Sequence, residues 1–287
     1  GGGSMTMRWS DRLDAAIART GSPVCVGLDP VVESMHPDLR ARHHEPAAAV
    51  REFTRGVLHA VAEHAAAVKF QSACYERYGE HGWAAMHEGM AEAAMLGLAV
   101  LWDAKRGDIS TSAGHYAAAA KRLGAHCVTV SGYMGRSAIT PFLDAGLGAF
   151  VLVRTSNPDS DAVQGLRLAD RTVAEMMADE VRDLGRERVG SSGLSDVGAV
   201  VGATKSGDAS ALRARMPDQV FLVPGYGAQG GTAEDVRSML RPDRRGVLIT
   251  ASRSIIYASA GIGSRWTDAV AAAAARMKAE LAAVISG

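Results

Sequence analysis

Three charged residues follow one apolar, strand-like segment, residues 98–102. They are Asp103, Lys105 and Asp108. Side chains at positions i and i+2 of an extended strand share a face, so Asp103 and Lys105 are predicted to point into one space. Gly107 lets the backbone turn, so that Asp108 can swing back toward that space or toward a neighbouring subunit. An ammonium group between carboxylates can stabilise developing negative charge and donate a proton, so we prefer a functional site to a solvated loop.

A second group of residues predicts an anion site. The glycine-rich stretch 224–231 (PGYGAQGG) follows another apolar run, and glycines let backbone N–H groups approach an anion, with a helix expected from near Thr232. Arg253 follows the last apolar run, and its planar guanidinium matches phosphate oxygens. The stretch also fits the dinucleotide pattern G-x-G-x-x-G. Because it does not lie in a first strand–helix–strand unit, we prefer a phosphate site to that motif or to a plain turn.

The elements that would position these residues alternate along the chain. Eight short apolar runs indicate strands buried on both faces: 23–28, 66–70, 98–103, 126–130, 149–153, 197–201, 220–223 and 247–251. Helix candidates lie at 47–64, 82–96, 111–123, 171–184, 232–240 and 266–285. Since no composition break divides residues 5–287, the pattern predicts an α/β fold with one domain, a single (β/α)8 TIM barrel. A doubly wound sheet is the alternative.

In a TIM barrel the active site lies where the strands end. Polar residues follow all eight predicted strands: Asp29, Lys69 with Gln71, Asp103 with Lys105, Ser131, residues 154–158, Thr204, the glycine-rich stretch, and Ser252 with Arg253. We therefore expect one common site that contains both lysines.

The composition narrows the classes of function. The chain has 287 residues, zero formal net charge and 47% hydrophobic residues, which gives no sign of a nucleic-acid or membrane partner. Cys25, Cys74 and Cys127 lie in apolar segments without metal-ligand spacing, and the histidines are scattered, so we expect reduced thiols, a cytoplasmic protein and no metal site. Residues 1–4, before Met5, are interpreted as a cloning remnant.

These motifs resemble the orotidine 5′-phosphate decarboxylase family, and its longer bacterial branch in particular. The resemblance rests on Lys69, Asp103-Ala104-Lys105-Arg106-Gly107-Asp108-Ile109, Thr155-Ser156-Asn157-Pro158, Gly202-Ala203-Thr204, the glycine-rich stretch and Ser252-Arg253. It covers essentially the whole chain after residue 4. The resemblance implies a carboxy-lyase that converts orotidine 5′-phosphate (OMP) to UMP without a cofactor.

For the charged residues the resemblance implies a catalytic tetrad of Lys69, Asp103, Lys105 and Asp108. Asp108 would reach into the partner subunit's site, which implies a homodimer with shared active sites. Loss of CO₂ from C6 of the pyrimidine leaves a carbanion, and Lys105 suits both the stabilisation of that charge and its protonation. Asp103 beside the substrate carboxylate would disfavour the ground state.

For the nucleoside 5′-monophosphate the resemblance implies binding residues from several strand ends. Asp29 would hold a ribose hydroxyl, Ser112 would contact the ribose across the dimer, and Ser131 would meet the pyrimidine. Gln229 and Arg253 would bind the phosphate. The full predicted set of binding residues is Asp29, Ser112, Ser131, Gln229, Gly230, Ser252 and Arg253.

The chain departs from the family pattern at two places. Ser110-Thr111-Ser112 stands where the branch has Gly-Ser-Thr, and Ser131-Gly132-Tyr133 stands where it has Asn-Pro-Tyr or Ser-Pro-Tyr. An alternative function is therefore a paralogue that acts on a modified nucleoside 5′-monophosphate in specialised metabolism. Two others are a Mg²⁺-dependent sugar-phosphate decarboxylase or synthase of the same superfamily, and a nucleotide-binding module without turnover.

Overall fold

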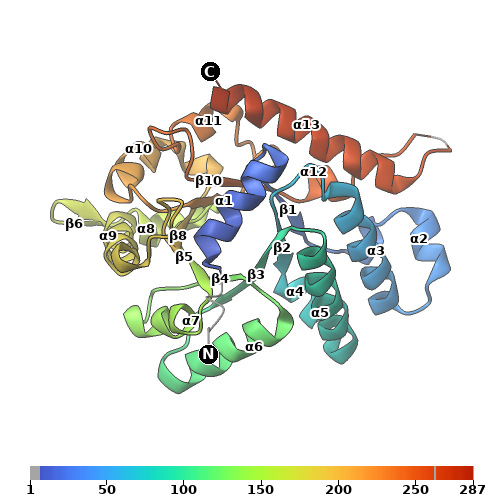
Figure 1. Ribbon diagram of the computed structural model, residues 1–287, viewed down its shortest axis with the longest axis horizontal. Helices are drawn as coiled ribbons and strands as arrows, with labels where there is room; N and C mark the ends of the chain where they lie inside the picture. The colour runs from blue at the N-terminus through green and yellow to red at the C-terminus, as the bar shows by residue number, and fades with distance from the viewer. Residues whose placement is uncertain (1–6, 262, 287) are drawn as a thin grey trace.

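The barrel predicted from the alternating pattern is present in the computed structural model, which describes residues 7–261 and 263–286. Eight parallel strands close in the order β1-β10-β9-β8-β5-β4-β3-β2 (Figure 1). Their bounds are β1 Val24–Leu28, β2 Ala67–Gln71, β3 Ala99–Arg106, β4 Cys127–Val130, β5 Gly148–Arg154, β8 Val197–Val201, β9 Phe221–Val223 and β10 Val247–Ala251. This confirms the (β/α)8 fold and all eight strands, although β3 runs on to Arg106. The proposed cloning remnant lies outside the described residues.

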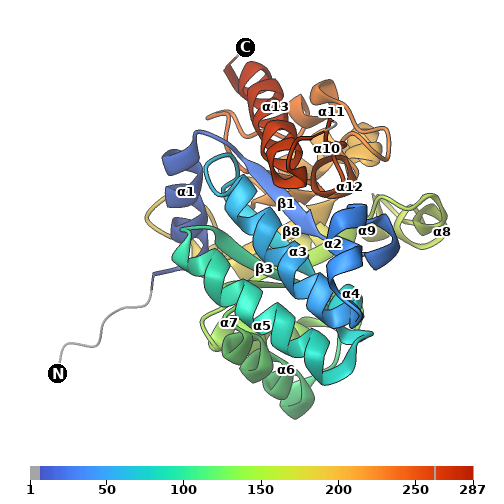
Figure 2. The same cartoon turned by 90° about the vertical axis from the view of Figure 1, so that its right-hand side faces the viewer.

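Helices surround the barrel (Figures 1 and 2). The predicted ones are α3 Pro46–Val61, α5 Gly79–Met95, α6 Ser110–Leu123, α9 Val173–Gly185, α11 Ala233–Arg237 and α13 Trp266–Ser286. The sequence patterns missed α1 Trp9–Thr20, α2 Pro37–Arg42, α4 Ser72–Glu76, α7 Thr140–Asp144, α8 Asp161–Gln164, α10 Ser206–Arg215 and α12 Arg253–Ile256. In the described ranges no helix is both long and apolar enough to cross a bilayer.

The start of the helix predicted at 171–184 is wrong by two residues. A small antiparallel hairpin, β6 Arg167–Leu168 and β7 Arg171–Thr172, precedes α9. The Thr172 hydroxyl accepts a hydrogen bond from the backbone N–H of Glu175, and the Glu175 carboxylate accepts one from the N–H of Thr172. This capping box starts the helix at Val173, because it satisfies two N–H groups that the first turn leaves free.

Helix α1 covers the end of the barrel at which the strands begin (Figure 1). Its Trp9 packs edge-on against Phe150 of β5, with ring centroids 5.9 Å apart, and both are buried in one cluster with Leu13. Gly148 lies so close to the Trp9 ring that a Cβ there would fall 2.3 Å from it. The bottom of the barrel is therefore closed by apolar packing, which leaves the opposite end for a polar site.

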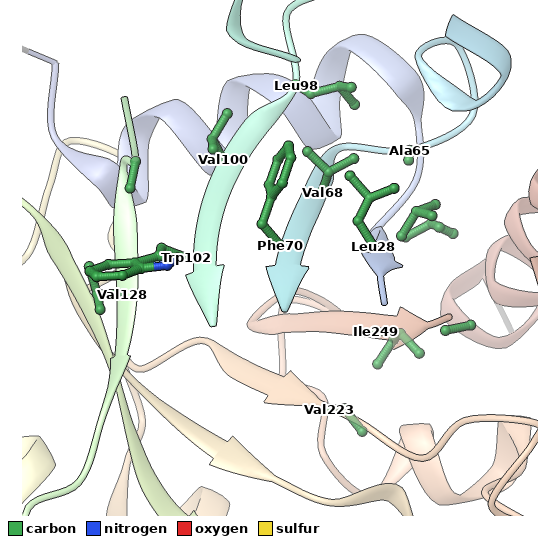
Figure 3. Close-up of a cluster of buried hydrophobic side chains, with 14 of the residues drawn as sticks. Leu28, Ala65, Val68, Phe70, Leu98, Val100, Trp102, Val128, Val223 and Ile249 are labelled. Atoms are coloured by element: carbon green, nitrogen blue, oxygen red, sulfur yellow. The ribbon is translucent and has the colours of Figure 1, made fainter. Parts of the chain in front are cut away.

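Alternation along each strand separates two apolar layers. Outward residues such as Val68, Phe70, Val100 and Trp102 belong to the large cluster beneath the helices (Figure 3). Inward residues from the first half of the strands, Leu101 among them, form a second cluster inside the barrel. Because side chains alternate with a period of two, the inward rows of the same strands continue toward their carboxyl ends and fix which residues face a site there.

His126, directly before β4, links stability to pH. Its Nδ1 accepts a hydrogen bond from the backbone N–H of Val100 (3.0 Å). Burial, with the nearby charge of Arg12, lowers the pKa of His126 from 6.5 to about 4. The unfolded chain binds this proton at higher pH than the folded chain, so the free energy of unfolding is expected to fall as the pH decreases from about 6.5 toward about 4.

Urea denaturation of wild type and His126→Asn at about pH 7 and about pH 5 checks this expectation. Asparagine can still accept from Val100 through Oδ1, but it does not titrate. The fall in unfolding free energy between the two pH values should therefore be smaller in the variant. Equal falls in both proteins would show that His126 does not carry the effect.

Candidate active site

The inward rows bring the charged residues of neighbouring strands together. On the inner face of the barrel, Lys69 follows Ala67 of β2, Asp103 follows Leu101 of β3, and Thr129 follows Cys127 of β4. Strands β2, β3 and β4 are adjacent in the barrel. Parallel neighbours place their carboxyl ends at one edge, so these side chains meet inside the mouth of the barrel.

A cavity of about 500 Å³ occupies this mouth. Seven predicted site residues line it: Asp29, Lys69, Asp103, Lys105, Gln229, Ser252 and Arg253. Further residues from the predicted strand ends line it too, among them Thr155, Ser156, Asn157 and Tyr226. Residues that the sequence analysis did not place at the site also line it, among them Thr129, Leu152, Gln164 and Thr250. Both lysines of the predicted common site thus line one cavity.

Asp103 is the centre of the polar array. Its Oδ2 accepts hydrogen bonds from Lys69 Nζ at 2.7 Å and from Gln71 Nε2 at 3.3 Å. Its Oδ1 accepts from Lys105 Nζ and from the Thr129 hydroxyl, each at 2.8 Å. Asp103 and Lys69 are 5% and 6% exposed, whereas the side chain of Lys105 is half-exposed toward the cavity. The ammonium of Lys105 is thus held by its hydrogen bond to Asp103 and is also accessible to a ligand in the cavity.

Charge pairing keeps this array ionised. Burial alone would raise the pKa of Asp103, but the ammonium groups of Lys69 and Lys105 outweigh it and hold that pKa well below its usual range. Burial alone would lower the pKa of Lys69, but the charges of Asp103 and Asp29 reverse the effect and raise it. Lys105 is the cation of this array with a half-exposed side chain, so it is placed to interact with an anion bound in the cavity.

Asp29, just after β1, presents an unsatisfied acceptor. Its Oδ1 is buried and has no hydrogen-bond partner among the described residues. The backbone around it is held by Tyr257, whose hydroxyl donates to the Asp29 carbonyl (3.0 Å) and accepts from the Val31 N–H (2.7 Å). A buried carboxylate oxygen without a donor is costly, so this one is suited to a ligand hydroxyl group.

The glycine-rich loop after β9 supplies the other side of the cavity, but not as expected. Gly227, Gly230 and Gly231 donate their N–H groups to the carbonyls of Gly231, Gly227 and Gly225, respectively. The positive φ angles of Gly225, Gly227 and Gly230 fold the loop back on itself and produce these bonds. These three amides, which the sequence pattern predicted would approach an anion, are therefore bonded within the loop in this structure.

Side chains replace those amides as candidate anion ligands. Gln229 lies at the tip of the loop, and its Oε1 is so near Gly225 that a Cβ there would fall 2.7 Å away. Exposed Arg253, the first residue of α12, faces the same cavity. Gln229 and Arg253 thus offer a neutral donor and a cationic fork at one edge of the mouth.

Four predicted residues do not line this cavity. Asp108 lies beyond the end of β3, is exposed, and accepts a hydrogen bond from the N–H of Ile109. Ser112 is exposed on the first turn of α6. Ser131 lies under the 106–107 turn, and Gly230 lies outside the lining beside Gln229.

The polar residues after β5 were expected at the common site but were given no role. Ser156 lines the cavity, whereas Ser131 does not. Gln164 of α8 fixes this segment, because its side chain accepts from the N–H of Thr155 (2.8 Å) and donates to the Thr155 hydroxyl (2.9 Å). The run of polar residues 155–157 directly after a buried strand indicated that these residues lie at the site. It is part of the family resemblance, but the resemblance was not used to give these residues a function.

The cysteines and the possible metal ligands of the described residues do not form a second site. Burial raises the pKa of Cys25 to about 12 and that of Cys74 to about 11, so neither thiol is a nucleophile at neutral pH. Among residues 7–261 and 263–286, no group of three His, Cys, Asp or Glu side chains is arranged to hold a metal ion.

Comparison with known proteins agrees with this geometry. The family model described as "Orotidine 5'-phosphate decarboxylase / HUMPS family" matches residues 22–262. A curated orotidine 5′-phosphate decarboxylase from Rhodopirellula baltica is 38% identical over 299 positions, covering 96% of this chain and 99% of its own. One from Deinococcus radiodurans is 41% identical over 243 positions, covering 82% and 84%.

A solved structure extends the agreement to three dimensions. The OMP decarboxylase of Leishmania donovani superposes with a TM-score of 0.81 at 35% sequence identity, covering 98% of this chain and all of the other. The family match, the near-complete coverage and the shared barrel agree with one another. This chain belongs to the orotidine 5′-phosphate decarboxylase / HUMPS family.

Proposed function

We propose that this protein decarboxylates OMP to UMP, the reaction for which its curated relatives are named. The observation that carries the proposal is the hydrogen-bonded Lys69–Asp103–Lys105 array, which faces the same cavity as Gln229 and Arg253. A cationic proton donor and a separate anion-binding edge are what a nucleotide decarboxylase without a cofactor requires.

The substrate is oriented through its phosphate, its ribose and its base. Gln229 and Arg253 bind the 5′-phosphate, and the unsatisfied oxygen of Asp29 accepts a ribose hydroxyl. The base then extends toward the ends of β3 to β5, where Ser156 supplies a hydroxyl to the pyrimidine edge. In this proposal Ser156 takes the role expected of Ser131.

In the chemical step the bond between C6 and the carboxylate carbon breaks, CO₂ leaves, and the electron pair stays on C6. The ammonium of Lys105 stabilises this carbanion as it forms and then transfers a proton to C6, which yields UMP and a neutral amine that solvent reprotonates. Asp103 holds Lys105 in place and disfavours the carboxylate of the ground state. Lys69 keeps Asp103 ionised.

A direct assay of OMP turnover by the purified protein tests the proposal. Stoichiometric formation of UMP and CO₂ is the expected result. Binding of UMP without turnover of OMP would instead favour the paralogue specific for a modified nucleotide, or the binding module. Turnover that survives EDTA would count against the Mg²⁺-dependent alternative, because EDTA removes the metal. The geometry also disfavours this alternative: Asp103 already accepts hydrogen bonds from two ammonium groups, which a divalent cation would have to displace.

The active unit in this proposal is a homodimer. Asp108 and Ser112 are exposed and do not line the cavity of their own chain. Large apolar side chains are exposed beside Asp108, on α6 and in the loop after β4: Ile109, Tyr116, Tyr133 and Met134. An apolar surface of this kind at the rim of a site supports a subunit interface.

Mixed dimers test the shared site. Lys105→Ala and Asp108→Ala are each expected to be nearly inactive as homodimers. When equal amounts are unfolded and refolded together, half of the dimers contain both chains, and one of their two sites has an intact Lys105 and an intact partner Asp108. Activity should return to about a quarter of the wild-type value. If the mixture stays as inactive as its components, Asp108 serves its own subunit.

A further inference from the structure

The pairing of β3 with β4 is interrupted beside the site. Trp102 is paired with Val128, but the next pair is Arg106 with Val130, so residues 103–105 lie opposite Thr129 alone. Lys105 has a left-handed backbone with φ 45°, which is unfavourable for a residue with a Cβ. This bulge lies between Asp103 and Lys105, which both line the cavity, and it leaves the N–H of Lys105 without the usual partner on the neighbouring strand.

The side chain of Thr129 fills that gap. Thr129 is 1% exposed, and its Oγ1 lies 3.0 Å from the backbone nitrogen of Lys105 and 2.8 Å from Oδ1 of Asp103. Ionised Asp103 can only accept, so the hydroxyl donates its proton to Asp103 and accepts one from the Lys105 N–H. One hydroxyl group therefore ties the strained backbone of Lys105 to the carboxylate that binds the Lys105 ammonium.

We propose that Thr129 is a positioning residue for the decarboxylation, which holds the backbone of Lys105 and the carboxylate of Asp103 in the relative geometry that aims the Lys105 ammonium. This inference rests on the proposed function. Without the hydroxyl, the N–H of Lys105 and one lone pair of Asp103 lose their partner in a buried place, so the left-handed turn loses its restraint. A small displacement of a proton donor is enough to slow a reaction strongly.

Thr129→Val removes the hydroxyl and keeps the shape, and Thr129→Ser keeps the hydroxyl. We expect Thr129→Val to lower kcat for OMP by about 30-fold while KM and the Kd for UMP stay within about threefold. Thr129→Ser should keep kcat within about threefold of wild type. Thr54→Val is the matched control, because Thr54 is equally buried and its hydroxyl is hydrogen-bonded to Tyr75 (2.8 Å), and neither residue lines the cavity.

Three results would overturn the proposal. The first is an unchanged kcat in Thr129→Val. The second is an increase in KM of that variant with kcat unchanged, which would mean that the hydroxyl binds substrate, and the third is a loss of kcat in Thr129→Ser as large as that in Thr129→Val. If Thr129→Val does not fold, Thr129→Ala replaces it in the comparison with serine. Absence of OMP turnover by the wild type would reject the proposed function instead.

A crystal structure of Thr129→Val gives a readout that does not depend on activity. We expect the Lys105 backbone to leave its left-handed conformation and the Lys105 Nζ to Asp103 Oδ1 distance to exceed the present 2.8 Å. An unchanged backbone and an unchanged ion pair in that variant would show that Thr129 does not position Lys105.

Discussion

Replacing Lys105 with alanine is expected to lower kcat/KM for OMP by at least about 10⁴-fold, because one ammonium supplies both the electrostatic stabilisation of the carbanion and the proton. The fold should survive, since Asp103 keeps its bonds to Lys69, Gln71 and Thr129, and the Lys105 side chain is half-exposed. The Kd for UMP should change little, because the phosphate and ribose contacts lie elsewhere in the cavity. Steady-state kinetics and calorimetric titration with UMP measure the two quantities.

Two controls make the Lys105 result specific. Lys121→Ala removes an exposed ammonium on α6, outside the site, and should leave kcat/KM unchanged. Lys105→Arg keeps the charge but places it differently and donates its proton far less readily, so it should remain severely impaired. CO₂ release by Lys105→Ala at the wild-type rate would contradict the proposed mechanism.

Replacing Arg253 with alanine is expected to have the second-largest effect, a loss of about 10³-fold in kcat/KM for OMP. The guanidinium is exposed on α12 and faces the cavity, so its removal should not unfold the protein. Binding energy from the phosphate is used to orient a base that reacts some distance away, so part of the loss should appear in kcat. Steady-state kinetics separate kcat from KM.

Orotidine, which lacks the phosphate, is the matched control for Arg253. Wild type and Arg253→Ala should turn over this nucleoside at the same low rate, because Arg253 has nothing to bind. Equal losses with OMP and with orotidine would mean that Arg253 acts on the site in general and does not bind the phosphate.

The sequence was sufficient to predict the barrel and the inner array. Asp103 and Lys105 lie two positions apart on one strand, and alternation alone places them on one face. Lys69 could be added because buried parallel strands end at a common edge. These predictions hold because they depend on the periodicity and hydrophobicity of short segments, which are local properties of the chain.

Details that depend on the closure of loops could not be predicted. The glycine-rich stretch was expected to direct its amides at an anion, but its positive φ angles let the loop satisfy those amides internally. Ser131 and Ser156 both follow a strand and carry the same hydroxyl group, yet only Ser156 lines the cavity. The sequence contains no signal for the direction in which each turn leaves the barrel.

The bulge at residues 103–105 was equally hidden. The strand pattern ends at Asp103, but the extended segment continues to Arg106 with a left-handed Lys105 in between. Helix α1 was missed because its apolar face covers the end of a barrel, a partner that exists only after the chain has folded. Long-range contacts, and not local propensity, decide both features.

A crystal structure with UMP bound tests the central claim most directly, because UMP carries the reacting carbon and the phosphate in one molecule. We predict that the phosphate lies against Gln229 and Arg253, and that C6 lies about 3–3.5 Å from Nζ of Lys105. A nucleotide bound in this cavity with C6 turned away from Lys105, or with its phosphate at another place on the barrel, would contradict the mechanism.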